Sequence, residues 1–228
     1  MKFRYFDILV GIFVAVLIIS NISSAKILKL GPFSFDGGTI LFPLAYIFGD
    51  IFTEVYGYKR TRRIIWIGFS ANILMALCFL AIGKLPSAIG WNNQTAYDAI
   101  LGWVPRIVLA SIIAYWIGEF TNSFILAKMK IWTKGKWLWT RTIGSTIVGE
   151  LLDTIFFCSI AFYGQIPMKL LLIVIISNYV FKVGVEIAFT PITYSIVGFL
   201  KKKENIDVFD YQTKFTPFNI KDSEYDGN

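Results

Sequence analysis

The sequence has no histidine, and charged residues make up only 16% of its 228 residues. Without histidine there are no Ser-His-Asp triads, Cys-His dyads, HExxH zinc sites or histidine proton relays. There are two cysteines, Cys78 and Cys158, and both lie inside apolar runs. They are too few for a four-ligand zinc set or a disulfide scaffold, so we expect both to be small buried apolar residues.

Apolar side chains are abundant instead. Hydrophobic residues make up 56% of the chain and aromatic residues 17%, and the mean hydropathy is +0.62. A soluble domain carries roughly 25% charged residues, and so much apolar surface would leave large patches exposed to water. The composition therefore favours a protein whose solvent is the lipid bilayer.

Six apolar stretches are long enough to cross a bilayer, which takes about 20 residues. They lie near residues 8–27, 39–57, 64–83, 105–127, 142–163 and 170–199. The second contains Pro43, Gly49, Asp50 and Glu54, so we expect protein to surround it. The sequence predicts an all-α integral membrane bundle of six transmembrane helices over residues 1–200, followed by a cytoplasmic tail over 201–228.

Basic residues mark the orientation of this bundle. Fourteen of them fall on one side of the predicted spans and five on the other. The fourteen are Lys2, Arg4, Lys59, Arg60, Arg62, Arg63, Lys128, Lys130, Lys134, Lys136, Arg141, Lys201, Lys202 and Lys203. The positive-inside rule then places both termini in the cytoplasm of a multi-pass protein of the cell membrane. The net charge of +7 is thus a topology signal, and no nucleic-acid partner is predicted.

Polar residues inside the spans are candidates for function, because charge at membrane depth is costly. Several share one helix face at spacings of three or four residues. The candidates are Asn21, Asp50, Glu54, Glu119, Asn122, Glu150, Asp153, Lys182 and Glu186. Asp50, Glu119 and Glu150 each lie nine residues from a flanking basic residue, which is roughly 13 Å along a helix. They should therefore form one layer near the middle of the membrane.

Acids outnumber bases in this layer, with six carboxylates against Lys182. Pairing within the spans cannot neutralise them all, even if Lys182 paired with Glu186. The polar groups could still serve only to hold helices together. The surplus favours a cavity for a donor-rich heterocycle, or alternatively for a cation or a proton.

One long motif resembles a known family. Residues 38–58 read GTILFPLAYIFGDIFTEVYGY and are followed by RTRR at 60–63. This block is similar to the queuosine precursor transporter family, also described as the vitamin uptake transporter family. Further similarity lies at Ser20-Asn21, at 118–123 (GEFTNS), at 150–154 (ELLDT) and at 179–182 (YVFK).

The resemblance implies a carrier that imports 7-deazaguanine bases, the precursors of queuosine in tRNA. The nine candidates above would bind this small molecule, and no catalytic residue, metal or cofactor is implied. The fold would be similar to the substrate-binding components of energy-coupling vitamin transporters. Assembly into homo-oligomers stays open.

Three alternatives remain on the sequence alone. The chain could be the vitamin-binding subunit of an ATP-driven importer, or it could have a purely structural role. An intramembrane enzyme is the third, with Asp50, Glu54, Glu150 and Asp153 as oxygen ligands for Mg²⁺.

Overall fold

A computed structural model describes residues 3–31, 33–211, 213, 215 and 216. The order of elements is α1 (Phe6–Ser23), β1 (Ile27–Leu30), β2 (Phe33–Asp36), the short 3-10 helix η1 (Gly37–Ile40), α2 (Phe42–Tyr56), α3 (Tyr58–Gly83), α4 (Gln94–Leu101), α5 (Val104–Trp132), α6 (Leu138–Phe162) and α7 (Met168–Glu204).

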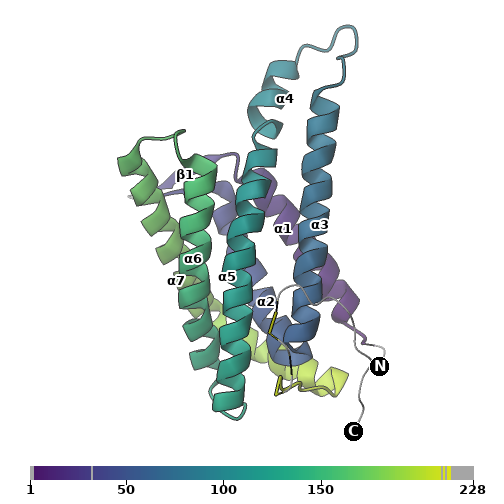
Figure 1. Cartoon of the computed structure of the whole chain (residues 1–228), viewed down its shortest axis with the longest axis vertical. Helices are drawn as coiled ribbons and strands as arrows, with labels where there is room; N and C mark the ends of the chain where they lie inside the picture. Colours follow the sequence, from purple (N-terminus) through teal and green to yellow (C-terminus); the bar gives the residue numbers. More distant parts are fainter. Residues whose placement is uncertain (1–2, 32, 212, 214, 217–228) are drawn as a thin grey trace.

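The long helices form an elongated bundle (Figure 1). Five helical segments in the described residues are long and apolar enough to cross a membrane. They are α1, α3, α6, α7 and the segment Gln94–Trp132, which combines α4 with α5. The α2–α3 junction, the α5–α6 loop and the end of α7 lie together at the lower end of Figure 1. We call this the basic end, because the predicted basic segments gather there.

The sixth predicted stretch, residues 39–57, becomes α2, which has only 15 residues. At 1.5 Å per residue it is about 22 Å long, which is less than the ~30 Å hydrocarbon core. Every residue of α2 except Leu44 and Phe48 is buried. This confirms that protein surrounds the polar stretch.

Large apolar side chains cover the outside of the bundle. Leu74 of α3, Leu109 of α5 and Ile176 of α7 are more than half exposed in the isolated chain. Such a surface suits lipid rather than water. Cys158 is buried as predicted, but the same prediction for Cys78 is wrong, because Cys78 is exposed on α3.

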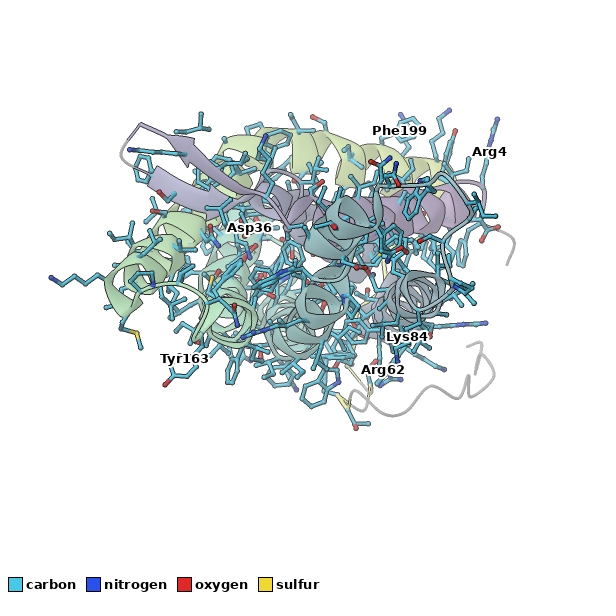
Figure 2. All side chains as sticks on the ribbon, turned by 90° about the horizontal axis from the view of Figure 1, so that it is seen from above. Arg4, Asp36, Arg62, Lys84, Tyr163 and Phe199 are labelled. Atoms are coloured by element: carbon cyan, nitrogen blue, oxygen red, sulfur yellow. The ribbon has the colours of Figure 1, made fainter. Side chains whose placement is uncertain are left out.

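A β-hairpin interrupts the predicted all-α fold. β1 pairs antiparallel with β2, from Ile27 opposite Asp36 to Leu30 opposite Phe33. Asp36 ends the hairpin and caps η1 by accepting a hydrogen bond from the Gly38 N–H. Figure 2 shows Asp36 among the helices, away from the rim where Arg4 and Tyr163 lie.

Two helices run further than the apolar stretches that predicted them. α5 continues to Trp132 and α7 to Glu204, so Lys130 and Lys201 stand on helices rather than in connecting segments. α7 also contains Pro191, whose missing N–H leaves one helical hydrogen bond unmade. After α7, residues 205–211 fold back across the basic end. Lys2 and residues 217–228 of the predicted tail lie outside the described residues.

Candidate functional site

Glycines bring α5 and α6 into close contact at the middle of the bundle. A Cβ placed on Gly149 would lie 2.8 Å from Asn122 Cβ and 2.9 Å from the Gly118 carbonyl oxygen. A Cβ on Gly49 of α2 would collide with the Glu119 carboxylate. Small residues at such positions let helix backbones approach closely. The contact holds the polar side chains of α2, α5 and α6 next to one another.

Lys182 of α7 is held between two carboxylates of α6. Its Nζ lies 2.6 Å from Asp153 Oδ2 and 3.1 Å from Glu150 Oε2. All three side chains are at most 3% exposed. A Lys182–Glu186 pair, which the alternative of purely helix-holding polar groups would include, is not the pairing that Lys182 makes. Although these two residues are four apart on one helix, the cation faces α6 instead.

Three further acids lie in the same layer on α2, α5 and α7. Asp50 accepts a hydrogen bond of 2.8 Å from Asn122 Nδ2, and Glu119 accepts one of 3.1 Å from Ser123 Oγ. The carboxyl group of Glu186 faces that of Asp50. Apart from this contact with Asp50, neither carboxyl oxygen of Glu186 has a hydrogen-bond partner within the described part of the chain. The structure thus brings Asp50, Glu119, Asn122, Glu150, Asp153, Lys182 and Glu186 together, and we call them the central acidic layer.

A small polar cavity opens from this layer toward the β-hairpin. Its volume is ≈ 10 Å³, which is room for about one water molecule. The lining includes Asp153 and Lys182 from the acidic layer and residues from α1, the hairpin and α5. The lining residues are Asn21, Ser24, Asp36, Gly38, Thr39, Phe42, Ser111, Asp153, Phe157 and Lys182.

Asp36 is the main functional candidate that the sequence prediction missed. Its carboxylate accepts hydrogen bonds from Ser24 Oγ at 2.6 Å, Thr39 Oγ1 at 2.7 Å and Asn178 Nδ2 at 3.2 Å. It joins α1, the hairpin and α7 on one side of the cavity. The available signal was an acid directly before Gly37-Gly38, a pattern typical of a tight capping turn.

Asn21 lines the cavity from α1, as the sequence suggested. Its Nδ2 donates to Asn72 Oδ1 at 2.8 Å and to the Leu17 carbonyl at 3.0 Å. Asn21 therefore also connects α1 to α3. Asn21 is not part of the central acidic layer, but it lines the same cavity as Lys182.

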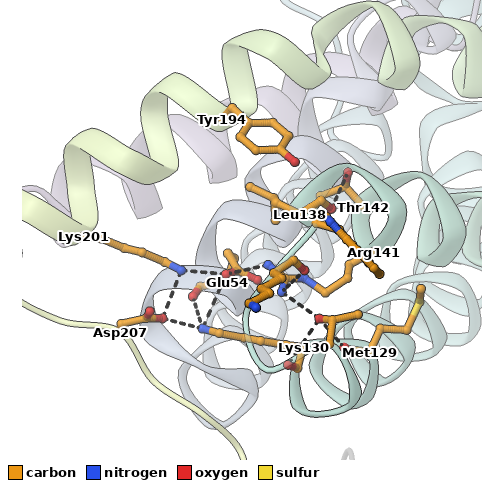
Figure 3. A network of polar contacts seen from close by, with 12 residues as sticks. Glu54, Met129, Lys130, Leu138, Arg141, Thr142, Tyr194, Lys201 and Asp207 are labelled. Carbon is orange, nitrogen blue, oxygen red and sulfur yellow. Dashed lines mark hydrogen bonds and ion pairs between the residues drawn. The ribbon is translucent and has the colours of Figure 1, made fainter.

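Glu54 belongs to a different network at the basic end (Figure 3). Its Oε1 lies 2.6 Å from Lys201 Nζ, 3.0 Å from an Arg141 nitrogen and 3.6 Å from Lys130 Nζ. Glu54, Lys130 and Arg141 are each 1% exposed. Although Asp50 and Glu54 share one face of α2, one helical turn places them in two separate clusters. Three cations surround Glu54, so among the predicted site residues the surplus of acid lies in the central layer.

A larger hollow lies elsewhere, on the outer face of α7. It measures ≈ 360 Å³ and lies between Phe33 and Phe189, with a lining that is almost entirely carbon. A surface of this kind can be filled by lipid chains and offers little to orient a polar ligand. The polar cavity is the better candidate site despite its smaller volume.

Residues 36–196 match the family model described as "Putative vitamin uptake transporter". The chain belongs to the vitamin uptake transporter family. The match begins at Asp36 and ends beyond Glu186, so it includes every member of the central acidic layer. With its apolar helices, this membership makes the chain a multi-pass integral membrane protein of the cell membrane.

Named relatives agree with this family. The "Probable queuosine precursor transporter" of Bacillus subtilis is 29% identical over 77% of this chain and 77% of its own length. The "Queuosine precursor transporter" of Escherichia coli is 26% identical over 70% of this chain and 71% of its own. A relative in Haemophilus influenzae, also named "Probable queuosine precursor transporter", is 27% identical over 60% and 58%. No solved structure is significantly similar to the chain.

Proposed function

We propose that this member of the vitamin uptake transporter family is a carrier that imports queuosine precursors, the 7-deazaguanine bases used to modify tRNA. The observation that carries the proposal is the polar cavity. Lys182 lies between two carboxylates and lines this cavity together with Asn21 and Asp36. The names of the three relatives supply the substrate class.

The chemistry of the cavity suits such a base. A 7-deazaguanine edge presents an N1–H and a 2-amino donor side by side, and a carboxylate accepts both through strong charge-assisted bonds. The 6-oxo group requires a donor, which Lys182 supplies. Phe42 offers an aromatic face beside this cation, with the Lys182 Nζ 4.5 Å from the ring centroid. An aminomethyl substituent would carry a positive charge and gain from the surplus of acid in the central layer.

The residues proposed to bind the base are the central acidic layer together with Asn21 and Asp36. Glu54 is proposed to act on the same substrate only indirectly, from its network at the basic end. We also propose that α2 counts as the sixth crossing, that both termini face the cytoplasm, and that the fold resembles the substrate-binding components of energy-coupling vitamin transporters. The carrier moves its substrate without chemical change, in a transport domain of residues 1–200 with the tail 201–228 at its cytoplasmic end.

Uptake in cells tests the proposal directly. A strain unable to make the precursor and lacking its own carrier is given the chain and fed the base, and queuosine is measured in its tRNA. Restored queuosine is expected, whereas its absence despite membrane insertion would contradict the proposal. Asp50→Ala should abolish the rescue, because it removes the partner of Asn122. Asp98→Ala is the matched control, since Asp98 is an exposed acid on α4.

A further inference from the structure

The chain that follows α7 crosses the basic end of the bundle, and we call residues 205–211 the C-terminal strap. Asp207 Oδ1 lies 2.6 Å from Lys130 Nζ, which also donates to the Val208 carbonyl at 2.7 Å. Asp210 accepts a hydrogen bond of 3.1 Å from the Tyr58 N–H at the start of α3. The strap is thus fixed to α5 and α3 by polar contacts.

Apolar contacts seal the strap against two turns of the bundle. A Cβ on Gly57 would lie 2.6 Å from Val208 Cγ1, and the φ of +84° at Gly57 suits glycine. Phe209 lies over Lys130, with the Nζ 4.6 Å from the ring centroid. A Cβ on Gly135 of the α5–α6 loop would lie 3.1 Å from the same ring. The strap therefore fits closely over both the α2–α3 junction and the α5–α6 loop.

A buried row of hydroxyl groups leads from the central acidic layer to the underside of the strap. Glu119 accepts from Ser123 at 3.1 Å, Ser123 contacts the Thr53 hydroxyl at 3.2 Å, and Thr53 contacts the Thr61 hydroxyl at 3.2 Å. Thr61 in turn donates to the Gly57 carbonyl at 3.1 Å. The three hydroxyl residues are each at most 1% exposed. This polar row ends at Gly57, the residue that Val208 covers.

The strap is held by the same ions that surround Glu54. Lys201 lies 2.6 Å from Glu54 Oε1 and 3.0 Å from Asp207 Oδ1, and Lys130 also contacts both acids. Asp207 is 45% exposed while Glu54 is 1% exposed. Asp207 is therefore the member of this network that water already reaches most easily. Separating it from its lysines should cost less than separating a fully buried member from its partners.

We propose that the C-terminal strap is a gate that closes the polar row at the basic end and opens when Asp207 separates from Lys130 and Lys201. The cavity of ≈ 10 Å³ cannot hold a bicyclic base, so any passage through the bundle requires a displacement. Releasing the strap breaks the ion pairs of Asp207 and the contacts of Val208, Phe209 and Asp210, none of which belongs to the packing of α5 on α6. The gate concerns the path through the bundle, whatever molecule takes it.

Thiol labelling of the polar row tests the gate without any substrate. Thr61→Cys is introduced after Cys78→Ala and Cys158→Ser remove the native thiols. The protein is placed in lipid nanodiscs, where both ends are open, and treated with a membrane-impermeant maleimide. With the strap intact, labelling of the introduced thiol should be slow. Asp207→Ala should raise the labelling rate about fivefold or more, and ending the chain at residue 204 should do the same.

Three controls separate a gate from general loosening. Asp7→Ala removes another exposed acid near the same end and should leave the rate unchanged, as should ending the chain at residue 216. Ser111→Cys reports on the far cavity, and its labelling should stay slow in Asp207→Ala. An unchanged rate at the Thr61→Cys position in both strap variants would overturn the gate. An equal rise at the Ser111→Cys position would overturn it too. Because no base is added, the outcome is independent of the uptake experiment.

Discussion

At the scale of single residues, Lys182 sets the charge of the central acidic layer. Lys182→Met removes its cation and leaves Glu150 and Asp153 buried without their partner. Removing one member of a buried ion pair typically costs about 3–5 kcal/mol. We expect a clearly lower unfolding temperature in detergent and loss of uptake. Adding Asp153→Asn should restore part of the stability, because it removes one of the stranded charges.

The matched control for this variant is Lys169→Met. Lys169 is exposed near the start of the same helix, so its loss should change the unfolding temperature little. Equal unfolding temperatures for wild type and Lys182→Met would show that Lys182 carries no buried charge that its neighbours need.

Asp207 gives a pH-dependent prediction at the same scale. Partial burial tends to raise its pKa, but hydrogen bonds from Lys130 and Lys201 outweigh burial and hold the pKa below its ordinary value of 3.8. A carboxylate with a lowered pKa stabilises the folded state fully above its unfolded pKa, and this stabilisation is lost as pH falls through the folded pKa. Wild type should therefore unfold at a higher temperature than Asp207→Asn at pH 7. The gap should close below about pH 3.8, and a gap that widens in acid would contradict this assignment.

At the scale of elements, the α5–α6 contact positions the central acidic layer. Gly149→Ala places a methyl group 2.8 Å from Asn122 Cβ and 2.9 Å from the Gly118 carbonyl, so the two helices must separate. Overpacking of this kind costs about 1–3 kcal/mol. We expect weaker uptake and a lower unfolding temperature.

Gly144→Ala on the same helix is the control for this packing. A Cβ there meets only the flexible end of Met129, at 3.4 Å from Cε, which is ordinary contact. If both alanine variants behave alike, close approach at Gly149 is not what positions Asn122 and its neighbours.

The sequence predicts the helices and their polar faces well, because lipid imposes long apolar runs in which any charge stands out. It predicts partners less well. Lys130 and Arg141 read as loop charges that mark topology, yet the longer helices return both to Glu54. Asp36 lies between the first two apolar stretches, in a hairpin that no helical period indicates. Residue spacing along one helix predicts which side chains share a face. Which charges on that face form ion pairs depends on how the other helices pack against it.

At the scale of the whole molecule, α2 decides whether the chain crosses the membrane five or six times. It is too short to span alone, but it carries the chain from η1, beside the cavity, to Gly57 at the basic end. The backbone N–H groups of Arg4 and Tyr5 donate to Glu204 at 3.0 and 2.7 Å. The start of α1 and the end of α7 therefore lie at the same end of the bundle, as the proposed six crossings would require.

Reporter fusions test this count. A fluorescent protein that matures only in the cytoplasm should be bright when attached to either terminus. Alkaline phosphatase, active only outside, should work after Asn92 in the α3–α4 connection and fail after Gly135 in the α5–α6 loop. Five crossings would place the two termini on opposite sides, so one terminal fusion would be dark. The two phosphatase fusions then show which segment fails to cross. Activity after both Asn92 and Gly135 would mean that the α4–α5 segment does not cross the membrane, rather than α2.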